Sequence, residues 1–244
     1  MPAIAQRAPA SLGVDLDRPV TSRLLDIFDR TSLPLGSSIL PYKGLNAGLR
    51  LPIRGIGRYV SLHSPEAAGD ALASELRLML ARGYAVWLVQ HVLNPGWEAS
   101  GQLGSDLGGA ARENALDVGY LPTCHLAIDV EGTVSKGDPV LEMIEAWAAE
   151  VTKSFPALCY VGYDNGLTPL DLYFGLGNVH LYWGAPGPWD VAERHFAVRQ
   201  GLPITIGGAE VDPDGIGEDA LGGALQWMVD PEKVGVRFRD LGVS

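Results

Sequence analysis

Short apolar runs alternate along this chain with segments in which apolar residues recur every three or four positions. The short runs have the composition of buried strands, and the intervening segments have the period of helices. The predicted strands cover residues 12–16, 55–62, 84–92, 125–132, 157–164, 178–186, 195–200 and 204–215. The predicted helices cover residues 19–30, 64–83, 107–118, 139–154 and a closing segment at 218–234. This order of strands and helices predicts an α/β fold.

Eight strands in a chain of 244 residues favour one barrel domain over residues 1–244, a (β/α)8 barrel of the TIM type. A segment rich in Pro, Gly and Ser at residues 31–54 predicts a long loop that makes the barrel irregular after its first helix. The alternative is an open doubly wound sheet. It is disfavoured because no glycine-rich phosphate loop follows the first strand.

The run HLAIDVEG, residues 125–132, combines an apolar face with an acidic one. Strand side chains alternate, so Leu126 and Ile128 share one face, while Asp129 and Glu131 share the other. The two acidic Cα atoms would lie roughly 6.5 Å apart in an extended strand. Repulsion and partial burial would raise one pKa and leave the other group ionised, as acid and base chemistry requires. The alternative is an Asp that caps the following turn and a solvated Glu.

The strand ends of a TIM-type barrel converge on one mouth, where its active sites lie. We therefore expect four acids to share this mouth as catalytic groups: Asp15, Asp129, Glu131 and Asp212, the last at the end of the eighth strand. Aromatic faces and hydrogen-bonding side chains at other strand ends suit a sugar. The candidate substrate-binding residues are Arg58, Tyr59, Gln90, Tyr163, Tyr182, Trp183 and Gln200.

The net charge of −11 disfavours nucleic acid and anionic membranes as partners, because both attract positive surfaces. No window reaches the roughly 20 apolar residues that span a bilayer, and the N-terminus does not have the pattern of a secretion signal. We expect a protein that is cytoplasmic as made and that reaches a wall by lysis or a non-classical route. Cys124 and Cys159 favour free buried thiols over a bridge, and no metal-ligand spacing appears. We expect neither a metal nor a cofactor.

Several segments resemble, in succession, the motifs of the glycoside-hydrolase-like barrels known as domain of unknown function 1906. These segments are GVDLD, GRYVS, AIDVEG, YVGYDNGLTP, LYWGAP, and RQG followed by GGAEVDPDG. That family is similar to the family 25 lysozymes of bacteria and phages, and the likeness spans nearly the whole chain. The resemblance implies a proton donor at Glu131 and an Asp129 that orients or stabilises the reacting sugar. It also matches Asp15, Asp212, Trp183 and Gln200 to positions of the family 25 pattern.

The chain departs from the family 25 pattern at Gly184, Gly201 and Asp214, where Ala, Tyr and Asn are usual. The leading hypothesis is a glycosidase that acts on the glycan strand of peptidoglycan. The second is a catalytically silent barrel that binds glycan or serves as a targeting module. The third is a metal-dependent phosphoesterase whose carboxylates hold Mg²⁺ or Ca²⁺. It is disfavoured because no basic cluster accompanies the acids. The oligomeric state is left open.

Overall fold

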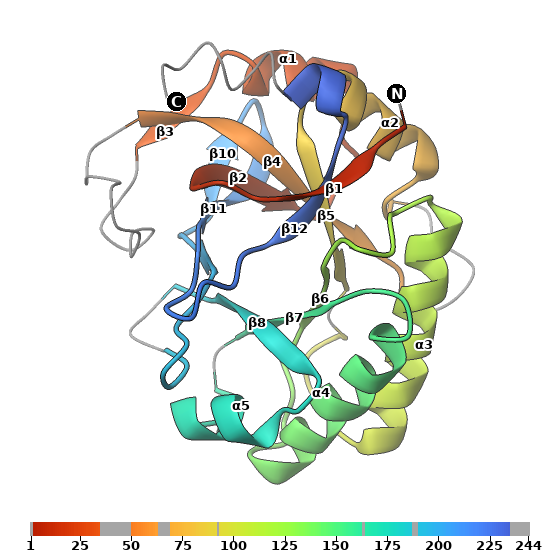
Figure 1. The fold of residues 1–244 in the computed structure, drawn as a ribbon, viewed down its shortest axis with the longest axis vertical. Helices are drawn as coiled ribbons and strands as arrows, with labels where there is room; N and C mark the ends of the chain where they lie inside the picture. Colours follow the sequence, from red (N-terminus) through yellow and green to blue (C-terminus); the bar gives the residue numbers. More distant parts are fainter. Residues whose placement is uncertain are drawn as a thin grey trace.

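Eight strands in the described part of the chain close into a barrel, which confirms the predicted TIM-type architecture (Figure 1). The computed structural model describes residues 2–34, 50–62, 69–91, 93–162, 164–186 and 190–234. The barrel strands are, in order around it, β2 (Ser11–Leu16), β4 (Arg50–Val60), β5 (Ala85–Gln90), β6 (Leu126–Asp129), β7 (Ala157–Val161), β8 (Val179–Gly184), β9 (Val198–Gln200) and β11 (Ala209–Ile216). Closure excludes the doubly wound sheet.

The last barrel strand runs against the others. Neighbouring strands from β2 round to β9 pair in parallel, whereas β11 pairs antiparallel with both β9 and β2. The reason is a hairpin, because β10 (Ile204–Ile206) turns through Gly207 and Gly208 directly into β11. The prediction that the eighth strand ends at Asp212 is therefore wrong. Asp212 lies within β11, opposite Asp15 of β2.

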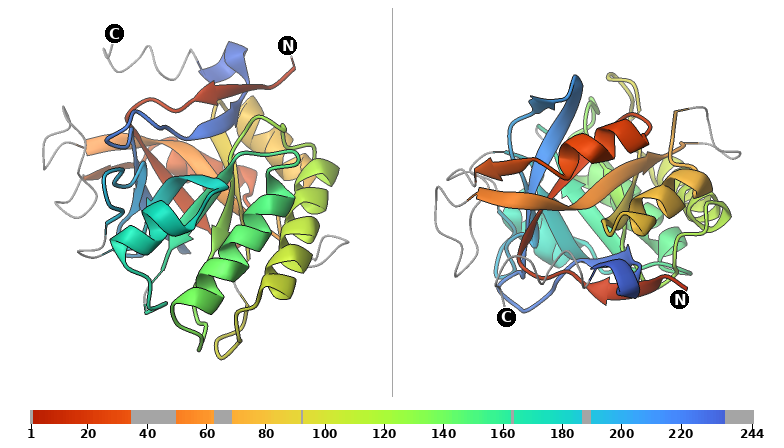
Figure 2. Two further views of the ribbon diagram at one scale, coloured as in Figure 1. Left: turned by 60° about the horizontal axis from the view of Figure 1, so that its bottom comes forward. Right: turned by 90° about the horizontal axis from the view of Figure 1, so that it is seen from above.

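A strand stands in the middle of the helix predicted at residues 218–234, of which only residues 231–234 are helical. β12 (Gln226–Val229) pairs antiparallel with β1 (Ile4–Arg7), a strand that the sequence analysis did not predict. β12 also pairs with β5 at Val86, below the point where β5 meets β6. The His125 side chain accepts a hydrogen bond from the Gln226 amide at 2.8 Å, which fixes β12 beside the start of β6. The β1 and β12 pair lies at one end of the barrel (Figure 2).

Helices cover the outer face of the barrel: α1 (Ser22–Phe28), α2 (Ala73–Ala81), α3 (Gly101–Asp117), α4 (Asp138–Val151) and α5 (Pro169–Gly175). α3 begins six residues before its predicted start, because the Ser100 side chain caps it by accepting from the Leu103 amide. α2 is shorter than predicted, and residues 63–68 of that prediction lie outside the described residues. β3 (Ser32–Pro34) pairs with β4 within the segment predicted as a loop.

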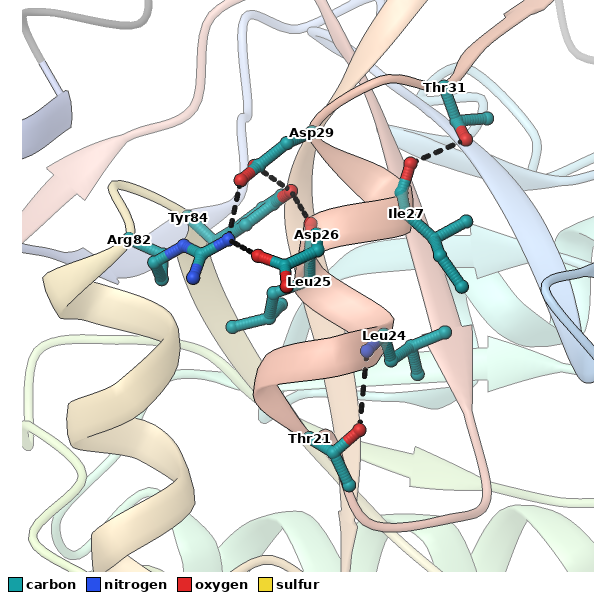
Figure 3. Close-up of polar contacts among 9 residues, drawn as sticks. All are labelled: Thr21, Leu24, Leu25, Asp26, Ile27, Asp29, Thr31, Arg82 and Tyr84. Carbon is teal, nitrogen blue, oxygen red and sulfur yellow. Dashed lines mark hydrogen bonds and ion pairs between the residues drawn. The ribbon is translucent and has the colours of Figure 1, made fainter.

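Side-chain contacts fasten α1 to the end of α2 (Figure 3). The Arg82 guanidinium contacts Asp26 and lies 2.7 Å from Asp29 Oδ2. The Tyr84 hydroxyl donates to the other Asp29 oxygen at 2.7 Å. Thr21 caps the first turn of α1 by accepting from the backbone amide three residues later. These contacts hold the helical layer against the strands that carry the first part of the mouth.

Apolar side chains in the described residues form two clusters, one on each side of the barrel wall. Leu126, Ile128 and Val130 belong to the cluster between the wall and the helices, whereas Ala127 belongs to the interior cluster. The predicted alternation of the central strand is therefore confirmed. Cys124 and Cys159 are buried free thiols, as predicted. No helix in the described part of the chain has the length and apolarity that crossing a membrane requires.

Glycines of α3 let it approach α4 closely. A Cβ atom at Gly104 would overlap the Met143 carbonyl oxygen, and one at Gly108 would lie 2.5 Å from the Trp147 carbonyl oxygen. We expect Gly104→Ala to lower the free energy of unfolding by about 1–3 kcal/mol, because a rigid backbone cannot make room. Urea denaturation measures this change.

The matched control is Gly109→Ala on the same helix, where an added Cβ would meet nothing within 4 Å. Alanine has the higher helix propensity, so this variant should gain up to about 1 kcal/mol. Equal effects of the two substitutions would contradict the close-packing interpretation.

Candidate active site

Acidic and aromatic side chains line a cavity of about 270 Å³, in which residues that follow β6 meet residues of β11. We call this cavity the acidic pocket. Its described lining consists of Tyr59, Val89, Asp129, Glu131, Tyr160, Trp183, Pro186, Gln200, Gly201, Leu202, Pro203 and Asp212. The structure thus brings together three of the four predicted acids and three of the predicted substrate-binding residues.

The fourth acid, Asp15, lies beneath the acidic pocket and is fully buried. It shares the inward face of β2 with Gly13, because side chains alternate along the strand. The Tyr59 hydroxyl donates to one carboxylate oxygen at 3.2 Å, and the Gln200 amide nitrogen donates to the other at 3.1 Å. Burial raises the pKa of Asp15 to about 6 despite these hydrogen bonds. Asp15 therefore titrates near neutrality.

Glu131 contacts a tyrosine that the sequence analysis did not select. The Tyr160 hydroxyl lies 2.7 Å from Gln200 Oε1 and 3.3 Å from Glu131 Oε1. A hydroxyl has only one proton, and the shorter contact to Gln200 takes it. Glu131 Oε1 is therefore the second, more distant acceptor of this hydroxyl. Burial raises the pKa of Glu131, although the hydrogen bond from Tyr160 lowers it, and the net shift favours the protonated carboxyl.

Asp129 and Asp212 complete the acidic wall. Burial, followed by repulsion from Glu131, raises the pKa of Asp129 well above its usual range. One Asp129 carboxylate oxygen is buried and has no hydrogen-bond partner among the described residues. Burial and repulsion from Asp15 raise the pKa of Asp212 to about 7. Burial thus raises the pKa of each of the four acids above its ordinary value.

Asp214 is a fifth inward-facing acid, one strand period below Asp212. It is 0% exposed, and neither carboxyl oxygen has a hydrogen-bond partner among the described residues. Its neighbours across β11 are Gln200 on one side and Gly13 on the other. Burial, followed by repulsion from Asp15, raises its pKa well above the usual range. Asp214 therefore holds its proton in the folded protein.

Two of the candidate substrate-binding residues face the helices instead of the acidic pocket. Arg58 is fully buried, and its guanidinium Nε lies 2.6 Å from Glu75 Oε1. Gln90 donates to the Leu107 carbonyl at 2.7 Å and accepts from the Trp147 indole at 2.6 Å. Their polar groups are satisfied within the outer layer, so the structure does not bring them to the acidic pocket.

Tyr182 also faces outward, since its hydroxyl donates to the Leu172 carbonyl at 2.6 Å. Its neighbour Trp183 faces inward and meets Tyr160 edge to face, with ring centroids 5.0 Å apart. Tyr163 lies outside the described residues. Of the candidate residues, Tyr59, Trp183 and Gln200 therefore line the acidic pocket.

The sequence analysis did not select Tyr160 and Asp214 as site residues, although the alternation of side chains along their strands could have identified both. Tyr160 alternates with Cys159 along β7 and pairs with Asp129 of β6, so it shares the inward face. Asp214 alternates with Pro213 in the same way below Asp212. Gly184 stands where the family 25 pattern has Ala. The packing explains this difference, because a Cβ atom at Gly184 would lie 2.7 Å from the Phe196 ring.

One group in the described residues has the donor set of a cation site. Oxygens of Asp17 and Asp70 and a nitrogen of His91 lie within 4.8 Å of one another. His91 Nε2 is 3.0 Å from the Asp17 carboxylate and 3.2 Å from the Asp70 carboxylate. The His91 ring packs on Tyr59, with centroids 4.8 Å apart. These ion pairs account for the grouping, and the expectation that no metal takes part stays a prediction.

No protein-family model and no curated protein matches this sequence. Solved structures do match its fold. The Tat-secreted protein Rv2525c of Mycobacterium tuberculosis is 14% identical over 89% of this chain and 98% of its own, with a TM-score of 0.61. An uncharacterized B. stearothermophilus protein is 14% identical over 84% of this chain and 95% of its own, with a TM-score of 0.59.

The modular autolysin LytC of Streptococcus pneumoniae, in complex with a synthetic peptidoglycan ligand, is 12% identical with a TM-score of 0.50. The match covers 84% of this chain and 46% of LytC. At these identities the likeness shows the fold alone. Membership of the family named domain of unknown function 1906 stays a prediction.

The buried proton of Asp214 predicts a pH effect on stability. The folded protein keeps this proton, whereas the unfolded chain releases it above the ordinary pKa of 3.8. Wild-type stability should therefore fall relative to Asp214→Asn as the pH rises above about 4. Denaturant unfolding at several pH values measures the difference. Glu113→Gln, which removes an exposed acid of α3, is the control and should show no such trend.

Proposed function

We propose that this protein is a glycoside hydrolase that cleaves the glycan strand of bacterial cell-wall peptidoglycan. The observation that carries the proposal is the contact of Glu131 with Tyr160. Tyr160 donates to Gln200 at 2.7 Å and lies 3.3 Å from Glu131, so it stabilises the Glu131 carboxylate only weakly, while burial favours the protonated carboxyl. A protonated carboxyl at the wall of a sugar-sized cavity is the general acid that glycosidic bond cleavage needs.

The remaining acids suit the charge that develops during cleavage. When Glu131 protonates the glycosidic oxygen and the bond breaks, positive charge forms on the sugar ring. Asp129, on the same face of the central segment, lines the cavity and can stabilise that charge in its ionised form. Glu131 is left as a carboxylate, which can accept a proton from the water molecule that attacks the sugar. This cycle uses the residues of the chain alone.

Two further observations support a carbohydrate substrate. The partly exposed Tyr59 supplies aromatic surface beside the acids, whereas Tyr160 and Trp183 line the cavity from almost fully buried positions. The fold is shared with LytC, a modular autolysin solved in complex with a synthetic peptidoglycan ligand. A phosphoester substrate is disfavoured, because the described lining of the acidic pocket contains no Lys, Arg or His to hold phosphate.

The first test is Glu131→Gln, which keeps the size of the side chain and removes its acid. We expect wild-type protein to clear a peptidoglycan suspension and the variant to lose on the order of a hundred- to ten-thousand-fold in rate. Turbidity and zymogram assays measure the loss. Glu113→Gln, which changes an exposed residue of α3, should retain full activity.

The same assays separate the hydrolase from a silent glycan-binding barrel. Wild-type protein that sediments with peptidoglycan but releases no reducing ends would support the silent barrel. Activity that survives Glu131→Gln would remove Glu131 from the mechanism.

A second test concerns the space that Glu131 occupies. A Cβ atom at Gly162 would overlap Glu131 Cγ and lie 3.0 Å from its carboxylate oxygen. Gly162→Ala should therefore displace the acid and lower kcat by about tenfold or more, while KM changes little. Gly109→Ala, with open space around the added methyl, is the control and should keep wild-type kinetics. Unchanged kcat in Gly162→Ala would show that the position of Glu131 is not critical.

A further inference from the structure

The acidic pocket has more carboxyl groups than bond cleavage requires. Asp129, Glu131 and Asp212 line it, and Asp15 is buried directly beneath. Cleavage by a carboxylate pair uses two such groups. Among the described lining residues there is no Lys, Arg or His to balance them. The surplus of acid therefore has no internal counter-charge in the pocket.

This surplus makes the acidic pocket complementary to a positive ligand. Repulsion among Asp15, Asp129 and Asp212 disfavours their simultaneous ionisation. A bound cation would relieve that repulsion. Its donors could be accepted by the carboxyl groups of Asp129, Glu131 and Asp212, which line the cavity.

The walls indicate what kind of cation fits. The cavity is about 270 Å³, far larger than a single ion needs, and part of its wall is aromatic or apolar. The partly exposed Tyr59 offers aromatic surface, and Leu202, which is 69% exposed, forms an apolar rim. A sugar ring presents an apolar face to such surfaces, and an ammonium substituent presents three donors to carboxylates.

We propose that the acidic pocket selects amino sugars whose amine is free and protonated, so that N-deacetylated glycan strands bind in preference to N-acetylated ones. This inference deepens the proposed function and rests on it. The net charge of −11 acts in the same direction, because it repels uronic acids and phosphorylated sugars.

The test compares glucosamine oligomers with N-acetylglucosamine oligomers of equal length. Isothermal titration at low salt should show that wild-type protein binds the glucosamine oligomers about tenfold tighter at about pH 6. Asp212→Asn should lose most of this preference, since it removes one carboxylate from the acidic pocket. Glu113→Gln removes one exposed acid from α3 and should keep the preference.

Three results would overturn the selectivity. The first is equal or tighter binding of the N-acetylated oligomers. The second is an equal loss of preference in Glu113→Gln and Asp212→Asn, which would assign the attraction to overall charge. The third is binding of spermidine as tight as that of the glucosamine oligomers, which would show adventitious polycation binding.

Reducing-end release from native and chemically N-acetylated cell-wall glycan separates this inference from the hydrolase proposal. Faster cleavage of the native, partly deacetylated glycan supports both. Cleavage that favours the N-acetylated glycan overturns the selectivity and leaves the hydrolase standing. Tight glucosamine binding without any cleavage overturns the hydrolase and leaves the ligand class standing.

Discussion

Among the described residues, three indoles lie in the interior cluster of the barrel, and the packing of two of them limits which residues can face it. Trp87 of β5 and Trp227 of β12 both belong to the interior cluster. A Cβ atom at Gly13 would lie 2.5 Å from Trp87, and one at Gly55 would lie 2.6 Å from Trp227. A Cβ atom at Gly57 would lie 2.6 Å from Trp87. Close-packed interiors do not yield at such distances, so β2 and β4 need glycine to close around the rings. The space below the acids is therefore filled with hydrocarbon.

This apolar floor explains the chemistry above it. Asp15 stands over it, and a Cβ atom at Gly57 would lie 2.8 Å from Asp15 Cβ, so glycine also makes room for the acid. A carboxyl group in this position has little contact with water, and its neighbours are acids instead of bases. Protonation is then the least costly response, which is why the pKa of Asp15 rises to about 6 and that of Asp212 to about 7. The desolvation that raises these pKa values destabilises the fold as the pH rises. The same desolvation keeps carboxyl protons available for transfer.

The alternation of side chains along each strand predicted many of the inward-facing residues and could have predicted more of them. It placed Ile128 outward and Asp129 inward on the central strand, as the structure confirms. The same rule allows only one residue of an adjacent pair to face the mouth, so Arg58 is turned away and Tyr59 is turned in. The reversal of β11 and the pairing of β12 with β1 depend on segments at opposite ends of the chain. Local periodicity cannot report those pairings, and the apolar residues before Gln226 fit a helix equally well.

The reversal of β11 also determines which residues line the acidic pocket. A parallel final strand would rise to the mouth and leave it through a loop, whereas β11 descends from the mouth out of a hairpin. That hairpin puts Leu202 and Pro203 on the wall of the acidic pocket, with Asp212 on the strand that follows. The Gly201 amide donates to the Pro213 carbonyl at 2.7 Å, which ties the wall to the acidic strand. The apolar rim and the acid therefore belong to one hydrogen-bonded unit. A shift of this hairpin would move the apolar rim and the Asp212 carboxyl together.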